Sequence, residues 1–460
     1  MSNEFDVYKL AEFGLKLAEA YNNNLKDAEI YFEFSKYINI EIEENSVKNS
    51  ELGNEGGASI RLIDSKGSLG FASTNRLEKK NIERMVSIGT KMMKSGTEDP
   101  DFKSLPHFFA NYAKVRNLYD KNIDNLTIED SIAYVEDLIT ICNEDELAIS
   151  QSGGFLSSSS KNYIFNTNDL NVNSKETICS ISSNVILKDK ISKDTTFGFD
   201  YQSERTLKKI NAENVINKAL NDGKRNLNRK KIKNIKCPLI LTPNGTISLI
   251  LKPIAQAINA ETFQYNRSFL ASQDKRGKVI ANQNLTIQDN GLIDGAVGSA
   301  IFDGEGVPCK NKTIIDKGKF LKKGLLHNSY TAGKEGVEST GNASRFSYNS
   351  VPSIGITNFI LKSGNVLYDE LISDIKEGIL LNYTGDRPNL STGDFSGLIL
   401  QGNLIINGEI KDPLDETLIG INLLDLFTRI ECVSKEVMTY GAFQAPYVKI
   451  EEVSIIGSLS

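Results

Sequence analysis

Glycine is concentrated in one stretch of this chain, and its spacing there limits the fold more than any other feature of the sequence. Residues 299–345 read SAIFDGEGVPCKNKTIIDKGKFLKKGLLHNSYTAGKEGVESTGNASR. Gly304 and Gly306 open an acidic turn, and Asp316, Lys317 and Gly318 have the composition of a hairpin turn, because glycine adopts positive φ without steric cost. The stretch therefore predicts short β-hairpins, whose open strand edges could bind another chain.

A second hairpin signal lies nearer the C-terminus. Asn407-Gly408 separates an apolar strand over 398–406 from a short strand over 409–411, and Asn-Gly is a typical central pair of a type I′ turn. A further strand is expected over 238–241. We therefore expect a mostly β, hairpin-rich C-terminal domain over residues 229–460.

The first half of the chain shows helical and strand periodicities in turn. A helix is predicted from Val7 to Ala18, strands over 30–43, 57–64 and 67–73, and a second helix over 77–89. This order of helix, strands and helix occurs a second time: a helix is predicted over 128–142, strands between 147 and 201, and another helix over 212–220. The fold class expected is α+β, with an antiparallel sheet in an N-terminal domain over 1–228. The repeated order has two interpretations: a duplicated helix–strands–helix unit (1–96 and 126–228), or coincidence within one α+β domain.

Length and charge support a soluble protein of more than one domain. The chain has 460 residues, and this length exceeds the usual size of a domain with a single core. Its composition, 40% hydrophobic and 24% charged, is ordinary for a globular protein. The predicted boundary near 224–236 contains seven basic residues and no acidic one. No aromatic residue is interleaved for base stacking, and the net charge of −6 gives no general attraction for polyphosphate. The pattern favours a solvated linker over a nucleic-acid site.

Cysteine usage and hydropathy predict the compartment. The five cysteines have wide, irregular spacing that fits neither a disulfide framework nor a CxxC motif, which favours a reducing cytoplasm. The first predicted helix is charged and has no apolar stretch typical of an export signal. The longest uncharged run, 346–361, has 16 residues and contains Asn, Ser, Gly and Pro, so it is too short and too polar for a bilayer. We expect a cytoplasmic protein without membrane insertion.

Scarcity of histidine restricts the chemistry. His107 and His327 are the only two, so no helix can present two imidazoles to one zinc ion. His327 and Ser329 are expected on a strand, where alternate residues point to opposite faces and cannot form a nucleophile and base pair. Four carboxylates could hold a hard cation, but their spacing does not match a calcium loop, and turn formation is favoured for them: Asp289, Asp294, Asp303 and Glu305.

Six ordered blocks carry a resemblance over most of the chain. They are GGASIRLIDSKGSLGFASTN (56–75), DKRGKVIANQNLTIQD (274–289), FDGEGV (302–307), GVESTGNA (336–343), TGDFSG (392–397) and MTYGAFQAPYVKIEEVSIIG (438–457). In these blocks the chain resembles the TldD/PmbA family, historically labelled modulators of DNA gyrase, and within it the PmbA (TldE) branch.

The resemblance implies a peptidase system in which a TldD-type subunit carries zinc on an HExxxH helix, completed by a cysteine near its C-terminus. In this chain LKPIAQAINAE (251–261) is similar to that helix by position, with Lys252 and Pro253 in place of His and Glu, Ala257 in place of the second His, and Cys432 matching the cysteine. Charged lysine, proline and alanine offer no donor atom to a metal. We therefore expect no catalytic residue, metal site or cofactor in this chain, and zinc in a TldD-type partner.

The implied function is that of a non-catalytic or accessory subunit of a zinc metallopeptidase complex. It would pair with a TldD-type catalytic subunit as a heterodimer or larger assembly, or form a homodimer in isolation, and hold unfolded peptides as extended strands. Tyr330, Gly341 and Asn342 are the candidates for lining the peptide groove, although turn and core roles would explain them equally well. Whether the chain is itself an enzyme stays open. Two alternatives remain: a stand-alone peptidase with an unrecognised site, and a regulator of DNA gyrase or of another protein.

Overall fold

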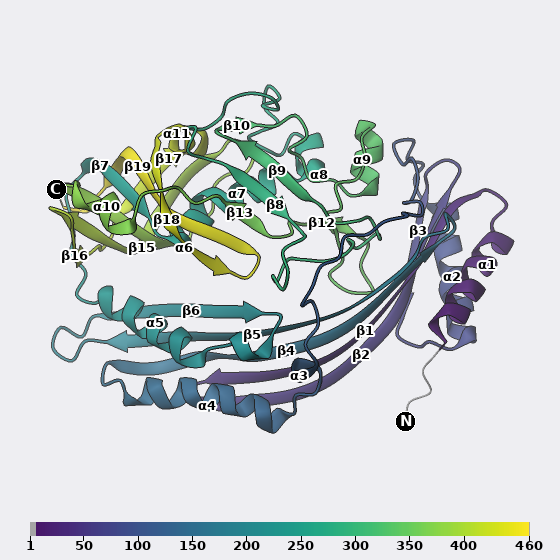
Figure 1. The fold of residues 1–460 in the computed structure, drawn as a ribbon, viewed down its shortest axis with the longest axis horizontal. Helices are drawn as coiled ribbons and strands as arrows, with labels where there is room; N and C mark the ends of the chain where they lie inside the picture. Colours follow the sequence, from purple (N-terminus) through teal and green to yellow (C-terminus); the bar gives the residue numbers. More distant parts are fainter. Residues whose placement is uncertain (1–5, 460) are drawn as a thin grey trace.

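The first half of the chain builds one curved antiparallel sheet of six strands (Figure 1). The structure is a computed structural model that describes residues 6–459. The strands lie in the order β3-β2-β1-β4-β5-β6. Their bounds are β1 Leu25–Glu43, β2 Ser46–Asp64, β3 Leu69–Thr74, β4 Ala148–Asn166, β5 Asn171–Lys188 and β6 Thr195–Glu204. A helix–three strands–helix order occurs twice, and the two halves join where β1 pairs with β4.

Four helices cover the outer face of this sheet: α1 Val7–Tyr21, α2 Lys79–Ser95, α4 Ile128–Glu144 and α5 Ala212–Arg225. The strand period of two explains the arrangement, because Ile30 and Phe32 pack against α1 and α2, while Ile38 and Ile40 pack with α4 and α5. A capping box at Thr127 begins α4. The alternate side chains point the other way, toward the C-terminal half. We call this side, which carries Glu29, Tyr31, Glu33, Ser35 and Tyr37 of β1, the inner face.

The second half forms an eleven-stranded sheet that contains a barrel. The barrel closes because β7 (Ile235–Leu241) pairs with both β14 (Glu377–Thr384) and β19 (Phe443–Ile456), and β15 (Asp394–Ile406) and β17 (Leu418–Asn422) complete it. The other strands are β8 Ile287–Asn290, β9 Asn311–Asp316, β10 Lys319–Phe320, β13 Phe359–Leu361, β16 Glu409–Pro413 and β18 Ile430–Tyr440. A separate two-stranded ribbon joins β11 (Ala343–Ser344) to β12 (Ser353–Ile354).

An uninterrupted helical segment packs into the barrel core. It comprises α6 (Pro243–Thr246), a π-helical turn over Ile247–Leu251, and α7 (Lys252–Ala257). Ten of its fifteen residues are buried, whereas Lys252 and Gln256 are exposed, and its apolar residues belong to the main core cluster with those of β7, β14 and β19. The remaining short helices are α3 Lys121–Asp124, α8 Ala260–Gln264, α9 Ser329–Glu335, α10 Tyr368–Ser373, α11 Leu423–Thr428 and a 3₁₀ turn at Leu207–Lys209.

The α+β class and both predicted hairpins are confirmed. Asn407 and Gly408 have φ of 51° and 76°, the two positive values of a type I′ turn between β15 and β16. Lys317 and Gly318, at 45° and 77°, join β9 to β10, although β10 has only two residues. The strand predicted around Ser329 is wrong. Asn328 accepts a hydrogen bond from the Thr331 amide and caps α9, so Ser329 begins a helix.

The basic stretch at 224–236 is largely neutralised by acidic side chains. Its ion pairs are Lys224–Asp145, Arg225–Asp222, Arg229–Asp194, Lys230–Asp412 and Lys231–Glu416. These acids come from both halves of the molecule, so the stretch fastens the N-terminal sheet to the barrel domain. No helix among residues 6–459 is long and apolar enough to cross a membrane.

Candidate functional site

A buried charge network joins the inner face to loops of the C-terminal half. Arg61 on β2 donates to Glu29 Oε2 at 2.8 Å and to Glu305 Oε1 at 2.7 Å. Arg345, just after β11, also pairs with Glu29, donates to the Gly304 carbonyl at 2.6 Å, and lies over the Tyr31 ring. At most 8% of any of these four charged side chains is exposed. The network therefore positions the loop 302–307 and the end of β11 against the sheet.

The electrostatics of this network are set by burial and by pairing. Burial raises the pKa of Glu29, but the charges and hydrogen bonds of Arg345 and Arg61 outweigh it and hold the pKa below its usual value. Glu305 also accepts hydrogen bonds from Ser329, at 2.7 Å from both its amide and its hydroxyl. Burial and the neighbouring charge of Glu305 raise the pKa of Asp303 to about 7, although three backbone amides donate to Asp303.

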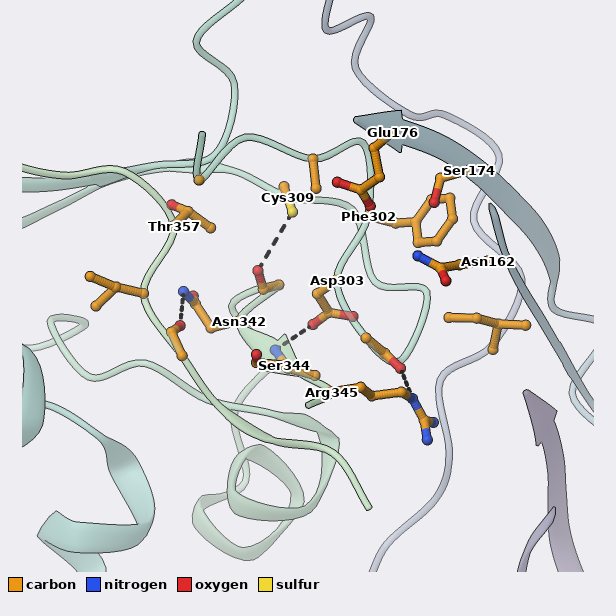
Figure 2. Close-up of a pocket in the computed structure, with 18 of the residues that line it drawn as sticks. Asn162, Ser174, Glu176, Phe302, Asp303, Cys309, Asn342, Ser344, Arg345 and Thr357 are labelled. Carbon is orange, nitrogen blue, oxygen red and sulfur yellow. Dashed lines mark hydrogen bonds between the residues drawn. The ribbon is translucent and has the colours of Figure 1, made fainter. Parts of the chain in front are cut away.

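A cavity of about 210 Å³ lies beside the network, between the inner face and the C-terminal loops (Figure 2). Asn162, Ser174 and Glu176 of β4 and β5 line one side, and loops of the C-terminal half contribute Cys309 and Asp303. Six glycine and alanine residues line the cavity as well: Gly298, Ala300, Gly304, Gly341, Ala343 and Gly355. Cavities for drug-sized ligands span roughly 300–1,000 Å³, so this one fits a single side chain or a chain end.

Two of the three predicted groove residues line this cavity. Gly341 has φ of 72°, and a Cβ there would lie 2.4 Å from the Pro308 carbonyl oxygen. Asn342 donates to Asp289 and to the Gly355 carbonyl, and its own carbonyl accepts from Lys312 and Thr340. Both residues therefore shape the cavity wall, and the amide of Asn342 is engaged within the protein.

Tyr330 lies apart from the cavity lining. Its hydroxyl donates to Asp99 at 2.9 Å and its ring stacks on Phe102, so it fastens α9 to the segment between the two N-terminal halves. The acidic residues singled out from the sequence are also engaged: Asp289 accepts from the Thr357 amide at 2.6 Å, and Asp294 pairs with Arg116.

The residues at the metal-helix position do not fit zinc. Lys252 is exposed at the start of α7, whereas Pro253 and Ala257 are buried in the barrel core. Cys432, on β18, packs against a different apolar cluster, and burial raises the pKa of its thiol. None of Lys252, Pro253 and Ala257 supplies a metal donor at neutral pH. Within the described part of the chain, no group of three His, Cys, Asp or Glu side chains is placed to hold a metal ion.

The charge network was missed by sequence reasoning. Glu29 and Arg61 look like ordinary polar positions of alternating strands, and their C-terminal partners lie 316 and 244 residues away along the chain. The one available signal was the resemblance itself. Arg61, Glu305 and the residues leading to Arg345 fall in or beside three of the blocks that carry it: 56–75, 302–307 and 336–343.

Comparison with known proteins gives a consistent picture over the whole chain. Three family models match: the PmbA/TldA metallopeptidase domain 1 at residues 28–92, the central domain at 121–227 and the C-terminal domain at 234–457. The metalloprotease PmbA homolog of Buchnera aphidicola is 27% identical over 99% of this chain and 98% of its own.

Two solved structures share the fold. One is a candidate modulator of DNA gyrase from Bacteroides thetaiotaomicron, with a TM-score of 0.86, 25% identity and 98% of each chain covered. The other is TldE from Thermococcus kodakarensis, with a TM-score of 0.85, 23% identity, and 98% of this chain and 100% of that one covered. The matched domains account for most of the sequence, and the chain belongs to the PmbA/TldD metallopeptidase family.

Proposed function

We propose that this chain is the non-catalytic subunit of a two-subunit zinc peptidase, and that it holds unfolded peptide for a TldD-type partner. The observation that carries the proposal is the donor set at the metal-helix position. Lys252, Pro253 and Ala257 cannot coordinate zinc, and Cys432 packs into another cluster. A single thiolate without imidazole partners gives no stable tetrahedral site. Water activation by zinc therefore belongs to the partner.

The peptide-holding role is supported by the cavity and its walls. Gly298, Ala300 and Gly355 add no bulky side chain to the cavity. An extended segment can pair its own backbone with an open strand whatever most of its side chains are. The inner face presents hydroxyl and amide side chains beside the cavity, among them Asn162 and Ser174. Such a wall suits chains that are unfolded and polar.

The proposed setting is the cytoplasm. All five cysteines are free thiols, and four of them are buried as small apolar side chains. A protein of this kind keeps its thiols where the surroundings are reducing.

The test combines metal analysis with reconstituted proteolysis. The purified chain is expected to hold zinc far below one ion per chain and to leave a fluorogenic unfolded peptide uncut. Mixing it with a zinc-bearing TldD-type subunit is expected to yield cleavage that 1,10-phenanthroline abolishes, and a stable complex on size-exclusion chromatography. The TldD-type subunit alone serves as the control for partner-independent turnover. One zinc ion per chain together with chelator-sensitive cleavage by this chain alone would overturn the proposal in favour of a stand-alone peptidase.

A further inference from the structure

The inner face of the six-stranded sheet has a one-sided charge distribution. The strand registers place Glu33 of β1, Glu51 and Glu55 of β2, and Glu176 of β5 on this face. Glu55 lies opposite Ser35, Ser35 opposite Ser160, and Ser160 opposite Glu176, so two of these acids share one row across four strands. The positions around them carry mainly serine, asparagine and glycine.

Positive charge on the same face is confined or distant. Two strand residues with positively charged side chains, Arg61 and Lys188, point to the inner face. This count covers residues 27–41 of β1, residues 49–63 of β2 and all of β3 to β6. Arg61 is already paired with Glu29 and Glu305 in the buried network, and Lys188 is the last residue of β5, twelve positions after Glu176. The other central lysines point to the outer face: Lys36, Lys161 and Lys175.

Several of these carboxylates lack a cationic partner in the described chain. No ion pair joins Glu33, Glu51 or Glu55 to a lysine or arginine among residues 6–459. Glu176 is paired through one carboxylate oxygen, which lies 2.6 Å from Nη1 of Arg205. One oxygen of Glu33 is buried without any hydrogen-bond partner. Burial is the main cause that raises the pKa of Glu33, with the charges of Glu55 and Glu176 acting in the same direction; together they outweigh the hydrogen bond from the Tyr348 backbone and the charge of Arg345, which lower it. These observations describe a surface whose charge is left to be balanced from outside.

The adjoining cavity is also surrounded mainly by acidic side chains, and it contains a hydroxyl group without a hydrogen-bond partner. At the Cys309 thiol, burial raises the pKa to about 12, and the charges of Asp303, Asp289 and Glu176 act in the same direction against that of Lys312 alone. Thr357 also lines the cavity; it is only 7% exposed, and its hydroxyl has no hydrogen-bond partner. A buried hydroxyl without a partner costs free energy that a bound group could recover.

We propose that the inner face and the cavity form a binding site for positively charged extended polypeptide, with Glu33, Glu55 and Glu176 receiving lysine or arginine side chains or a chain-terminal ammonium group. The inference rests on the proposed peptide-holding function and names the substrate class within it. Neighbouring strands lie about 4.8 Å apart, so Glu55 and Glu176 are separated by roughly 14 Å, the span of about four residues of extended chain. Peptides with cations about four residues apart fit best.

The experiment measures binding of the full-length chain to fluorescent peptides by anisotropy at low ionic strength. Three acetylated, amidated peptides share a Ser/Gly background and carry four lysines, four glutamines or four glutamates at every fourth position. We expect the lysine peptide to bind about tenfold more tightly than the glutamine peptide and to lose this advantage as salt is raised. A fourth peptide, the glutamine sequence with a free amino terminus, separates recognition of a chain end from recognition of side chains.

Variants assign the effect to the face. Combining Glu33→Gln, Glu55→Gln and Glu176→Gln keeps side-chain shape and is expected to reduce lysine-peptide affinity about tenfold, to the level of the glutamine peptide. The matched control changes the same charge on the outer helices, with Glu19→Gln, Glu136→Gln and Glu213→Gln, and is expected to preserve the preference. Glu55→Gln alone, which removes no side-chain hydrogen bond or ion pair among residues 6–459, is expected to reduce it about twofold should the triple variant be poorly folded.

The outcomes separate the two proposals. Equal binding of the lysine, glutamine and glutamate peptides would overturn the cationic site while leaving peptide holding intact. Absence of binding for every peptide would overturn both. Loss of the lysine preference in the outer-helix control would attribute the effect to net charge and likewise overturn the site.

Discussion

At the scale of single residues, Gly341 and Asn342 show how a cavity wall can be built from structural requirements. Asn342 uses its amide to hold Asp289, Gly355, Lys312 and Thr340 together. Gly341 precedes it in a left-handed conformation that brings its backbone against Pro308. Neither residue has a free group to offer a ligand through its side chain, so their contribution to binding is the shape of the wall.

Replacing Gly341 by alanine tests this role. Gly341 and Gly336 have nearly the same φ, 72° and 73°, but a Cβ at 341 would lie 2.4 Å from the Pro308 carbonyl oxygen, whereas a Cβ at 336 would meet nothing within 4 Å. Gly336→Ala is therefore expected to cost about 1 kcal/mol of unfolding free energy from backbone strain alone, and Gly341→Ala about 2–4 kcal/mol. Urea denaturation of both variants measures the difference. Equal losses of unfolding free energy in the two variants would mean that the backbone around Gly341 and Pro308 shifts to accept the added methyl group without cost.

At the scale of elements, the packing of the helical segment 243–257 limits which metal ligands could be introduced at the positions that the resemblance matches to the zinc helix. Pro253 and Ala257 face the packed barrel core, and the Ala257 carbonyl accepts a hydrogen bond from Ser268. A carboxylate at 253 would be buried without a partner, and an imidazole at 257 would overfill the core. The residues that orient metal ligands in a working site would have to be supplied as well.

The double substitution Lys252→His with Pro253→Glu is therefore expected to leave the chain inactive. Zinc measured by inductively coupled plasma mass spectrometry should stay far below one ion per chain, and the fluorogenic peptide should remain uncut. Lys252→His alone is the matched control, because Lys252 is exposed and this change should leave the unfolding free energy within about 0.5 kcal/mol of wild type. Zinc-dependent turnover by the double variant would show that the helix position was misassigned.

Elements defined by local chemistry could be predicted from the sequence, and those defined by distant contacts could not. The turns at Asn407-Gly408 and Lys317-Gly318 depend on residues a few positions apart, as do the helical periods of the N-terminal half. Asn328 capped a helix where alternation predicted a strand, because a single side-chain hydrogen bond outweighed a weak pattern. That Lys252, Pro253 and Ala257 offer no donor atom to a metal follows from their residue types alone. The acidic inner face required the strand registers.

At the scale of the whole molecule, two halves of different architecture are joined by charge. One connection is the exposed pair of Arg116 with Asp294, where Arg116 is 81% exposed. A second is the buried network in which Arg61 lies between Glu29 and Glu305. Water screens the first pair, whereas the second is largely removed from water. Losing a cation therefore has different consequences at the two places.

Arg61→Met is expected to lower the free energy of the first unfolding transition by about 3–5 kcal/mol, because it leaves Glu29 and Glu305 buried without their shared cation. Arg116→Met removes the same charge from the same junction and is expected to cost less than about 1 kcal/mol. Urea titration followed by far-ultraviolet circular dichroism measures both. Limited proteolysis of the 224–236 stretch adds a readout specific to the junction: separation of the halves should speed cleavage there in Arg61→Met and leave Arg116→Met like wild type. Similar losses in the two variants would show that the buried network contributes no more than a surface pair, and that the barrel domain is held against the sheet by its other contacts.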